Sequence, residues 1–393
     1  MAEVAEPDHG LSPESGEGSP GLYIHIPFCA SKCAYCSFNS QPCLAPPPQY
    51  LAALRRQIAF WASHAWSRER TFSSLFIGGG TPTLYESELA GLVSDCRGAF
   101  RFTDDAEVSV EANPNTVTSK TLDALRQAGV NRLSLGVQSL SDRLLASIGR
   151  THTAGQARGA VAMARQAGFN NLNLDLIYGL PGQSLVDWQA TLEEALALAP
   201  EHLACYELTI EEGTPFAGLH ASGLLELPEE DVVVAMAEAT HGLASQAGLT
   251  RYEISNYAKP GYECRHNLNY WENGSYLGIG AGAVSCLSGM RLSMVDDPER
   301  YVGLVEQGSQ PVAEAECLSL AARFRETVIM GLRLMEGVAI DRLQARFGLT
   351  PMDYYGSILD DLIAQGLAVM DEGRLRLAAH ALPVANQVLA RLV

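Results

Sequence analysis

The sequence predicts an α/β protein, built as a partial barrel of six strand–helix units with a helical module at its C-terminal end. Three observations lead to this fold class. Short β-rich runs alternate with amphipathic stretches over residues 21–210. A helical segment at 228–247 ends this alternation, and a loop-rich stretch follows at 255–300. Residues 318–393 then show three helical patterns and one hairpin pattern.

Six β-rich runs define the repeating part of the chain. They are LYIHIPF (22–28), SSLFIGGG (73–80), EVSVEANP (107–114), RLSLGVQS (132–139), NLNLDLIYGLP (171–181) and HLACYELTI (202–210). Amphipathic segments such as 119–130 separate them. In that segment Leu122 and Leu125 keep helical spacing, and Gly129 stands where a helix would end. Such units form parallel sheets, and six are too few to close an eight-stranded barrel, so we expect an open one.

The C-terminal part resembles a winged helix in its predicted elements. Helices are predicted at 318–334, 339–348 and 351–366, and a hairpin at 367–377 with Asp371-Glu372-Gly373 in its turn. Winged helices often bind DNA, but residues 316–393 hold 9 acidic and 8 basic side chains. This balance is not the footprint of a nucleic-acid-binding domain, so we predict a packing or docking module.

Charge and cysteine content limit the classes of partner. The net charge of −18 repels phosphate backbones and anionic lipids, which argues against nucleic acid and for transient membrane contact at most. Residues 1–20 carry five acidic side chains and no Lys or Arg, which predicts a disordered leader rather than a signal or transit peptide. Nine cysteines, three of them clustered, favour a reducing compartment, so we expect a cytoplasmic protein.

A cluster of three cysteines follows the first predicted strand: Cys29, Cys33 and Cys36. Thiolates suit zinc, copper(I) and iron–sulfur clusters. Structural zinc needs a fourth ligand, and His25 and Cys43 are poorly placed to supply it. Three thiolates on a four-iron cluster would instead leave one iron open to an external ligand, with Phe38 as an apolar cover. We therefore favour a [4Fe-4S] cluster, with a zinc-stabilised structural protein as the alternative.

Further unusual residues stand at the ends of the later strands. Gly78 to Thr81 end the second strand, Glu111 lies in the third, Gln138 in the fourth and Asp175 in the fifth. Chemistry gathers at the carboxyl ends of parallel strands, so these side chains should share one site with the cysteines. The run IGGGTP lacks the lysine of a phosphate-binding loop and does not indicate a nucleoside triphosphate.

The cysteine spacing, after a Tyr-x-His-x-Pro strand, resembles the radical S-adenosylmethionine (SAM) superfamily. In that superfamily the methionine end of SAM chelates the open iron, and an electron from the cluster can cleave SAM to a radical. The resemblance implies that the three clustered cysteines ligate a [4Fe-4S] cluster. It also implies a set of SAM-contacting residues: Tyr23, Tyr35, Gly79, Gly80, Thr81, Glu111, Gln138, Arg150 and Asp175.

Within this superfamily nearly the whole chain is similar to oxygen-independent coproporphyrinogen III oxidase (HemN) and its relatives. The similarity lies in GVQS (136–139), LIYGLPGQ (176–183) and YEISNYA (252–258). True oxidases carry a fourth cysteine where this chain has Phe38. The HemW haem chaperones resemble this chain in ending that loop with C-x-F. They also carry His-Asn-x-x-Tyr-Trp, which reads His266 to Trp271 here.

The resemblance implies a haem chaperone that carries a cluster and SAM and passes haem to apo-haemoproteins such as respiratory enzymes, with a homodimer among the expected states. Haem needs an axial ligand and an aromatic surface. We predict His266 for the iron and Tyr270 and Trp271 for the faces; the alternative is a core histidine with two packing aromatics. The competing function is oxidative decarboxylation of coproporphyrinogen III, so turnover stays open and no catalytic residue is assigned.

These predictions divide the chain into four parts. They are a disordered acidic leader at 1–20, a radical SAM partial barrel at 21–250, a connecting segment with the His-Asn-x-x-Tyr-Trp motif at 251–315, and a C-terminal HemN-like helical, winged domain at 316–393. The chemistry is assigned to the second and third parts.

Overall fold

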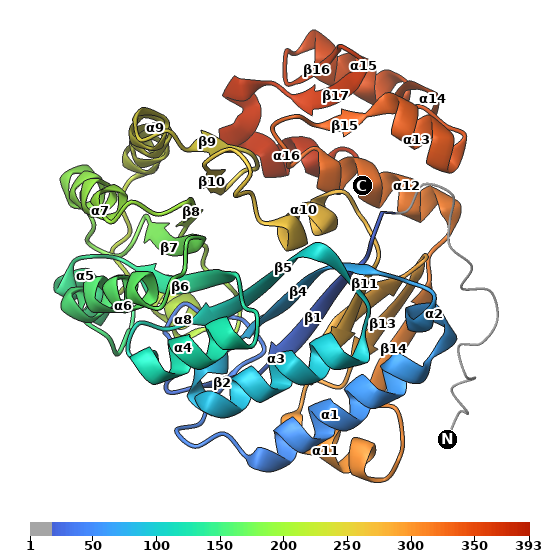
Figure 1. Cartoon of the computed structure of the whole chain (residues 1–393). Coiled ribbons are helices and arrows are strands. Elements are labelled where there is room, and N and C mark those ends of the chain that lie inside the picture. The colour runs from blue at the N-terminus through green and yellow to red at the C-terminus, as the bar shows by residue number, and fades with distance from the viewer. Residues whose placement is uncertain (1–17) are drawn as a thin grey trace.

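A computed structural model of the chain describes residues 18–393 (Figure 1). The predicted acidic leader lies almost wholly outside the described residues. The described chain is built around one twelve-stranded sheet with the order β14-β13-β12-β11-β1-β4-β5-β6-β7-β8-β10-β9. Helices cover its convex face, and a separate C-terminal module lies against one end (Figure 1).

Six parallel strands form the centre of this sheet and confirm the predicted strand–helix units. They are β1 (Gly21–Ile26), β4 (Phe72–Gly79), β5 (Phe102–Ala112), β6 (Arg132–Gln138), β7 (Leu172–Tyr178) and β8 (His202–Glu207). Each pairs in parallel with the next. In β6 the buried Leu133 and Leu135 face the helices, so the alternating Arg132 and Ser134 face the barrel interior.

Helices connect these strands and bury their apolar faces against the sheet. They are α1 (Pro48–Ser63), α2 (Ala65–Arg68), α3 (Ser87–Ala99), α4 (Ser119–Gln127), α5 (Asp142–Ser147), α6 (Ala154–Gln166), α7 (Leu185–Ala197), α8 (Pro215–Ala221) and α9 (Glu230–Gln246), with a short 3₁₀ turn at Pro82–Tyr85. The amphipathic segment at 119–130 contains α4, which ends at Gln127, and Gly129 follows with a left-handed φ of 94°, close to the helix end predicted there. Capping boxes at Thr153 and Ser184 start α6 and α7.

The stretch predicted to be loop-rich, 255–300, contains regular structure, and this expectation was wrong. The chain from 250 to 317 forms β9 (Thr250–Arg251), β10 (Asn256–Ala258), α10 (Arg265–Trp271), β11 (Tyr276–Ile279), β12 (Val284–Leu287), β13 (Met290–Met294), α11 (Pro298–Glu306) and β14 (Val312–Cys317). Strand β11 extends the parallel sheet beside β1. The strands are only two to six residues long, and this hid their pattern. A Cβ on Gly278 would stand 2.1 Å from the Val284 carbonyl oxygen, so glycine serves close strand approach here.

The C-terminal module has its own apolar core, which includes Phe324, Leu359 and Leu375. Its elements are α12 (Leu320–Gly331), β15 (Val338–Ala339), α13 (Ile340–Phe347), α14 (Pro351–Tyr355), α15 (Ser357–Ala364), β16 (Ala368–Asp371), β17 (Arg374–Leu377), a 3₁₀ turn at Ala379–Val384 and α16 (Ala385–Ala390). The predicted hairpin is confirmed, with Glu372 and Gly373 both at positive φ as a tight primed turn requires. The predicted helix at 351–366 is two helices, because Gly356 breaks it at a φ of 49°.

A helix that crosses a bilayer must be both long and apolar. No helix within residues 18–393 meets these two requirements.

Candidate functional site

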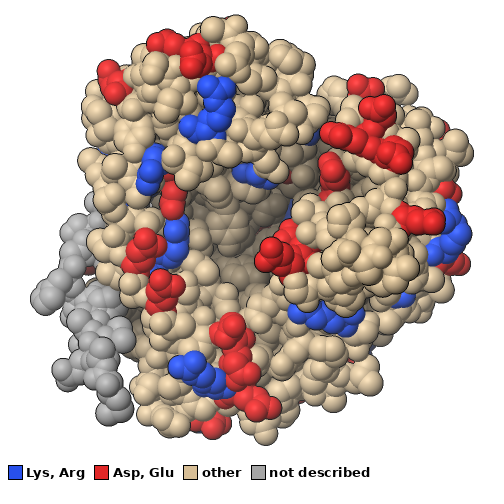
Figure 2. All heavy atoms as spheres, turned by 180° about the vertical axis from the view of Figure 1, so that it is seen from behind, with Lys and Arg blue, Asp and Glu red and all other residues tan. Residues whose placement is uncertain are grey.

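Three adjoining cavities run through the barrel. We call them the cysteine cavity (410 Å³), the aromatic cavity (650 Å³) and the floor cavity (250 Å³). Phe38, Gly79 and Glu111 line both of the first two, and Tyr23, Glu111 and Tyr270 line both of the last two. The molecule is deeply hollowed on one face, with charged groups of both signs around the hollow (Figure 2). The shared lining makes the three cavities neighbouring parts of one site.

The three clustered cysteines lie on a loop that folds back on itself. Strand β2 (Phe28–Cys29) pairs with β3 (Gln41–Pro42), and the Cys43 amide donates to the Cys29 carbonyl oxygen at 2.7 Å. The Lys32 ammonium group donates to the carbonyl oxygens of Phe38 and Ser40 and so stabilises the loop. Cys29, Cys33 and Cys36 line the cysteine cavity, whereas the Cys43 side chain packs against the main core. The structure thus brings the predicted ligands together and leaves Cys43 apart.

A single metal ion and a multi-iron cluster require different arrangements of ligands. Within residues 18–393 no three His, Cys, Asp or Glu side chains converge closely enough to hold a single metal ion. Both ring nitrogens of His25 are engaged, one with the Tyr23 hydroxyl and one with the Asn39 carbonyl oxygen, each at 2.8 Å. The donor set is therefore three soft thiols without a free histidine. This set fits a multi-iron cluster better than one zinc ion.

The glycine-rich bend after β4 brings backbone to the edge of the cysteine cavity. A Cβ on Gly80 would stand 2.5 Å from the Phe28 carbonyl oxygen, so this position has room only for glycine. The Gly79 amide donates to Glu111 Oε2 at 3.0 Å. The Thr81 hydroxyl donates to Cys29 Sγ at 3.5 Å and accepts from Asn113 at 2.6 Å. The bend is thus tied both to the cysteine loop and to the end of β5.

Arg150 is the basic group of the cysteine cavity. Its Nη1 lies 3.6 Å from Cys33 Sγ, and its Nη2 donates to the Gly136 carbonyl oxygen at 2.6 Å and to Asn113 Oδ1. Its buried Nε has no hydrogen-bond partner among the described residues. Gln138 lies nearby at a φ of 65°, and its buried Oε1 likewise has no partner there. Two unsatisfied polar atoms in one cavity are typical of a site that a polar ligand completes.

Two half-buried carboxyls, Glu111 and Asp175, lie near each other inside the barrel. Burial, and then the charge of Asp175, raise the pKa of the Glu111 carboxyl to about 7. Burial also raises the pKa of Asp175, although Asn173 and Ser134 donate hydrogen bonds to its two oxygens at 2.7 and 3.1 Å. A cationic ligand such as an ammonium group would stabilise both ionised forms.

The residues predicted to contact SAM lie mostly in the cysteine cavity. The members that line the cysteine cavity are Tyr35, Gly79, Gly80, Glu111, Gln138, Arg150 and Asp175. Thr81 lies directly behind the cavity wall through its bond to Cys29. Tyr23 differs, because it lines the aromatic and floor cavities.

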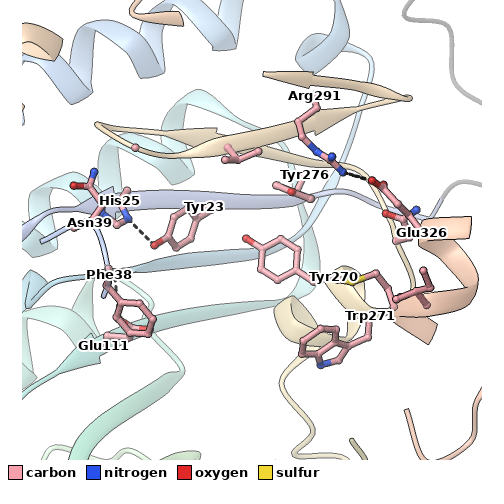
Figure 3. Close-up of a pocket in the computed structure, with 16 residues that line it drawn as sticks. Tyr23, His25, Phe38, Asn39, Glu111, Tyr270, Trp271, Tyr276, Arg291 and Glu326 are labelled. Carbon is pink, nitrogen blue, oxygen red and sulfur yellow. Dashed lines mark hydrogen bonds and ion pairs between the residues drawn. The ribbon is translucent and has the colours of Figure 1, made fainter. Parts of the chain in front are cut away.

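The aromatic cavity is lined mainly by rings and aliphatic side chains. Tyr270 points its hydroxyl toward Tyr23, and Trp271 lies beside it on α10 (Figure 3). The C-terminal module completes the wall with Ile329 and Met330 of α12. At that end Arg291 of β13 forms a two-pronged ion pair with Glu326 of α12, at 3.0 and 2.9 Å. The cavity is thus a broad, mainly apolar space, and one of its walls lies where the barrel meets the module.

His266 sits behind this cavity rather than in its wall. It is 1% exposed, and its ring stacks on Phe76 with centroids 5.2 Å apart. Its Nδ1 bonds the Ser74 hydroxyl at 2.8 Å and its Nε2 bonds the Tyr270 hydroxyl at 2.9 Å. Burial, and then the charge of Arg132, lower the pKa of His266 to about 3, so the ring is neutral. Ligation of haem iron by His266 stays a prediction, and it requires one of these two bonds to open.

The motif residues also lie at an unexpected end of the barrel. Helix α10 covers the amino ends of β1 and β4, where His266 lies against Gly21 and Ser74. The cysteines lie at the opposite, carboxyl ends. Sequence reasoning expected the chemistry at the carboxyl ends, but the cavities run the length of the barrel.

Several lining residues were not predicted, and they differ in how visible they were. Asn113 follows Glu111 by two residues at a strand end, and Arg132 breaks the apolar pattern of β6, so both carried a readable signal. The Arg291–Glu326 pair carried none, because the two residues come from different elements that meet only in the folded chain.

Comparison with known proteins agrees with this geometry. A family model of the radical SAM superfamily matches residues 23–195, and one of the HemN C-terminal domain matches residues 318–384. The heme chaperone HemW of Bacillus subtilis (strain 168) is 36% identical over 369 residues, which cover 93% of this chain and 97% of the relative. HemW of Mycobacterium tuberculosis (strain H37Rv) is 37% identical over 379 residues, with 95% of each chain covered.

One solved structure is similar over nearly the whole chain. Coproporphyrinogen III oxidase (HemN) from Escherichia coli, a radical SAM enzyme, superposes with a TM-score of 0.82 and 25% sequence identity. The match covers 95% of this chain and 90% of the oxidase. The shared architecture therefore includes the C-terminal module as well as the barrel.

Proposed function

The chain belongs to the HemW heme chaperone family within the radical SAM superfamily, and from this premise we propose that it binds haem and transfers it to apo-haemoproteins. The observation that carries the proposal is the 650 Å³ aromatic cavity, which contains Tyr270 and Trp271 of the motif and adjoins the cysteine loop. Haem is a flat apolar ring, and such rings bind where aromatic side chains cover their faces.

The cofactor assignments rest on the cysteine cavity. Cys29, Cys33 and Cys36 would hold the [4Fe-4S] cluster, and the polar set around them would hold SAM. When bound, a cluster with one open iron supplies one-electron chemistry to SAM. Arg150 is placed to bind a carboxylate, and Glu111 and Asp175 to accept hydrogen bonds from ammonium or hydroxyl groups. Arg150 Nε and Gln138 Oε1, which have no hydrogen-bond partner among the described residues, support this set.

His266 has a positioning role in this proposal. Its bond to the Tyr270 hydroxyl fixes the tyrosine ring at the cavity wall, while Ser74 fixes the histidine ring. If haem iron binds His266 Nε2, Tyr270 must give up that bond. The haem-bound protein would then have a tyrosine hydroxyl freed toward the floor cavity.

Haem titration tests the proposal directly. We expect the wild-type protein to bind haem stoichiometrically with a Soret band, and His266→Ala to shift that band if the imidazole ligates iron. His152→Ala is the matched control, because this histidine is also buried but lines none of the three cavities. Failure of the wild-type protein to bind haem would refute the proposal, and an unchanged band in His266→Ala would restrict His266 to positioning.

The competing function is oxidation of coproporphyrinogen III. The full-length similarity to the oxidase and the direct contact between the two cavities favour it. Phe38, whose side chain is 68% exposed, stands where the oxidases carry a fourth cysteine. This difference argues for the chaperone. Anaerobic incubation with SAM, a reductant and coproporphyrinogen III separates the two, because sustained protoporphyrinogen formation would establish the oxidase.

The same proposal extends to partners and location. We propose apo-haemoproteins such as respiratory enzymes as acceptors, a homodimer as one state of the chain, and the cytoplasm as its compartment. The reducing environment that three clustered thiols require supports the last of these. The acidic net charge of −18 supports partners other than nucleic acid.

A further inference from the structure

The floor cavity contains a buried arginine whose charge has no direct partner. Arg132 is 2% exposed, and among residues 18–393 no hydrogen bond or ion pair involves its guanidinium. The groups that act on its charge are Cys264, then Glu107, Tyr252 and Asp175, and none of these four forms a hydrogen bond or ion pair with it. Burial disfavours the charged guanidinium, but the attraction of these groups outweighs burial and raises the pKa of Arg132, so its charge is kept inside the barrel with its donors unpaired.

The neighbouring acids are already committed to other groups. Glu107 accepts hydrogen bonds from the amides of Arg265 and His266 at the start of α10. Both oxygens of Asp175 accept from Asn173 and Ser134, and Glu111 accepts from Gly79. Arg132 is therefore left as a positive centre in the barrel, and its charge also lowers the pKa of His202 and His266 after burial.

A second donor with no assigned role lines the same cavity. Asn267 is the second residue of the His-Asn-x-x-Tyr-Trp motif, and its half-buried side chain has no hydrogen-bond partner among the described residues. Arg132 and Asn267 thus offer donors from two separate elements, β6 and α10, to one space of 250 Å³. That space is too small for a tetrapyrrole ring but large enough for a carboxylate side arm.

The floor cavity adjoins the aromatic cavity at Tyr23 and Tyr270, which line both. A side arm of a ring held in the aromatic cavity would reach the floor cavity by passing between these two tyrosines. The other arginines near the ring are already engaged. Arg291 is paired with Glu326, and Arg150 bonds Gly136 and Asn113. Among the described arginines near the ring, Arg132 is the one whose guanidinium forms no hydrogen bond at all, whereas Arg150 keeps only its Nε unpartnered.

We propose that Arg132 and Asn267 form a carboxylate-binding subsite at the barrel floor, which receives a propionate arm of the tetrapyrrole held in the aromatic cavity. The inference rests on the proposed haem binding and deepens it, because it assigns the residues that recognise the acid group. Guanidinium–carboxylate pairs in dry surroundings are strong and directional, so the subsite would fix the ring's orientation as well as its affinity.

The test compares haem with haem dimethyl ester, in which both carboxylates are blocked. We expect the wild-type full-length protein to bind the free acid about tenfold or more tighter than the ester. Arg132→Met should reduce this ratio to near one by weakening only the free acid, and Arg132→Lys should restore part of it. Arg70→Met is the matched control, because Arg70 is also buried but bonds Trp66 and Ser288 away from the three cavities.

The outcomes separate this inference from the proposed function. If the wild-type protein binds acid and ester equally well, or if Arg132→Met keeps the wild-type ratio, the subsite is refuted and haem binding stands. If the wild-type protein binds neither compound, both proposals fall. Should Arg132→Met fail to fold, Asn267→Ala replaces it, since that side chain is half-buried, and an unchanged ratio there overturns the inference.

Discussion

The cysteine cavity and the aromatic cavity share a wall but are built on different plans. The cysteine cavity takes its side chains from one loop and from the ends of neighbouring parallel strands, and hydrogen bonds tie most of them together. The aromatic cavity takes its wall from β1, α10, β11, β13 and α12, which come from both ends of the chain. Its lining combines packed rings and aliphatic side chains with hydrogen bonds at His25 and Tyr270 and the Arg291–Glu326 pair.

This difference separates a site for a fixed group from a site for a passing one. The hydrogen-bonded polar cavity has a defined geometry and leaves two polar atoms for a ligand to satisfy. The apolar cavity offers area rather than direction, and its far wall belongs to a module with its own core. A carrier must release what it binds, so a cavity formed between two separately packed bodies suits transfer.

The largest expected effect breaks one cavity and spares the other. Cys33→Ala removes a thiol from the cysteine cavity, so the protein should lose its iron cluster completely after anaerobic reconstitution, because two thiolates cannot replace three. Haem affinity should stay within about threefold, since the aromatic cavity does not include Cys33. Iron and sulfide analysis, with haem titration, checks both. Cys317→Ala, at an exposed position, is the control, and loss of haem binding in Cys33→Ala would show that the cavities act as one.

The converse change removes a ring from the aromatic cavity. Trp271→Ala should weaken haem binding about tenfold, because a large aromatic surface is lost. Cluster content should be unchanged. Haem titration measures the effect, and Phe60→Ala, a partly exposed ring on α1, is the control. Wild-type affinity in Trp271→Ala would move the haem site out of this cavity.

Glu111 lines both cavities, and its ionisation sharpens the comparison. In the unfolded chain it titrates near 4.5 and in the folded chain near 7. Between these values only the folded state keeps the proton, so the free energy of unfolding falls as pH rises from about 4.5 to about 7. Glu111→Gln removes this contribution.

The size of that effect is limited, because the half-buried side chain faces a cavity that water can enter. We expect the wild-type protein to lose ~1–2 kcal/mol relative to Glu111→Gln between pH 5 and pH 8. Urea unfolding at both pH values measures the difference. A difference that does not vary with pH would contradict the raised pKa.

The smallest expected effect concerns the ion pair between barrel and module. Arg291→Met should cost about 0.5–1 kcal/mol of stability, because the pair is only partly shielded from water. Haem should dissociate faster, since α12 forms part of the cavity wall. Stopped-flow haem release and thermal unfolding test this. Arg55→Met, which breaks an exposed pair with Asp95 on the helical side, is the control and should leave haem release unchanged.

The cysteine cavity could be predicted from sequence because its residues follow a local rule. Gly79, Glu111 and Gln138 stand at or near the carboxyl ends of strands, and parallel strands bring those ends together, whereas Arg150 follows α5. The aromatic cavity could be predicted only at Tyr270 and Trp271, through the motif. Tyr276, Arg291 and Met330 depend on how short strands and a separate module pack, and no spacing in the chain records that. The bonds that hold His266 behind the wall were hidden for the same reason.

Phe38 stands on the cysteine loop and lines both the cysteine and the aromatic cavity. It is therefore a shared partition, and its position enters the binding free energy on both sides. If SAM and a tetrapyrrole bind as proposed, any change that SAM makes in the tetrapyrrole's affinity through this ring equals the change that the tetrapyrrole makes in the affinity for SAM. The affinity for haem would then depend, through Phe38, on whether SAM is bound at the cluster.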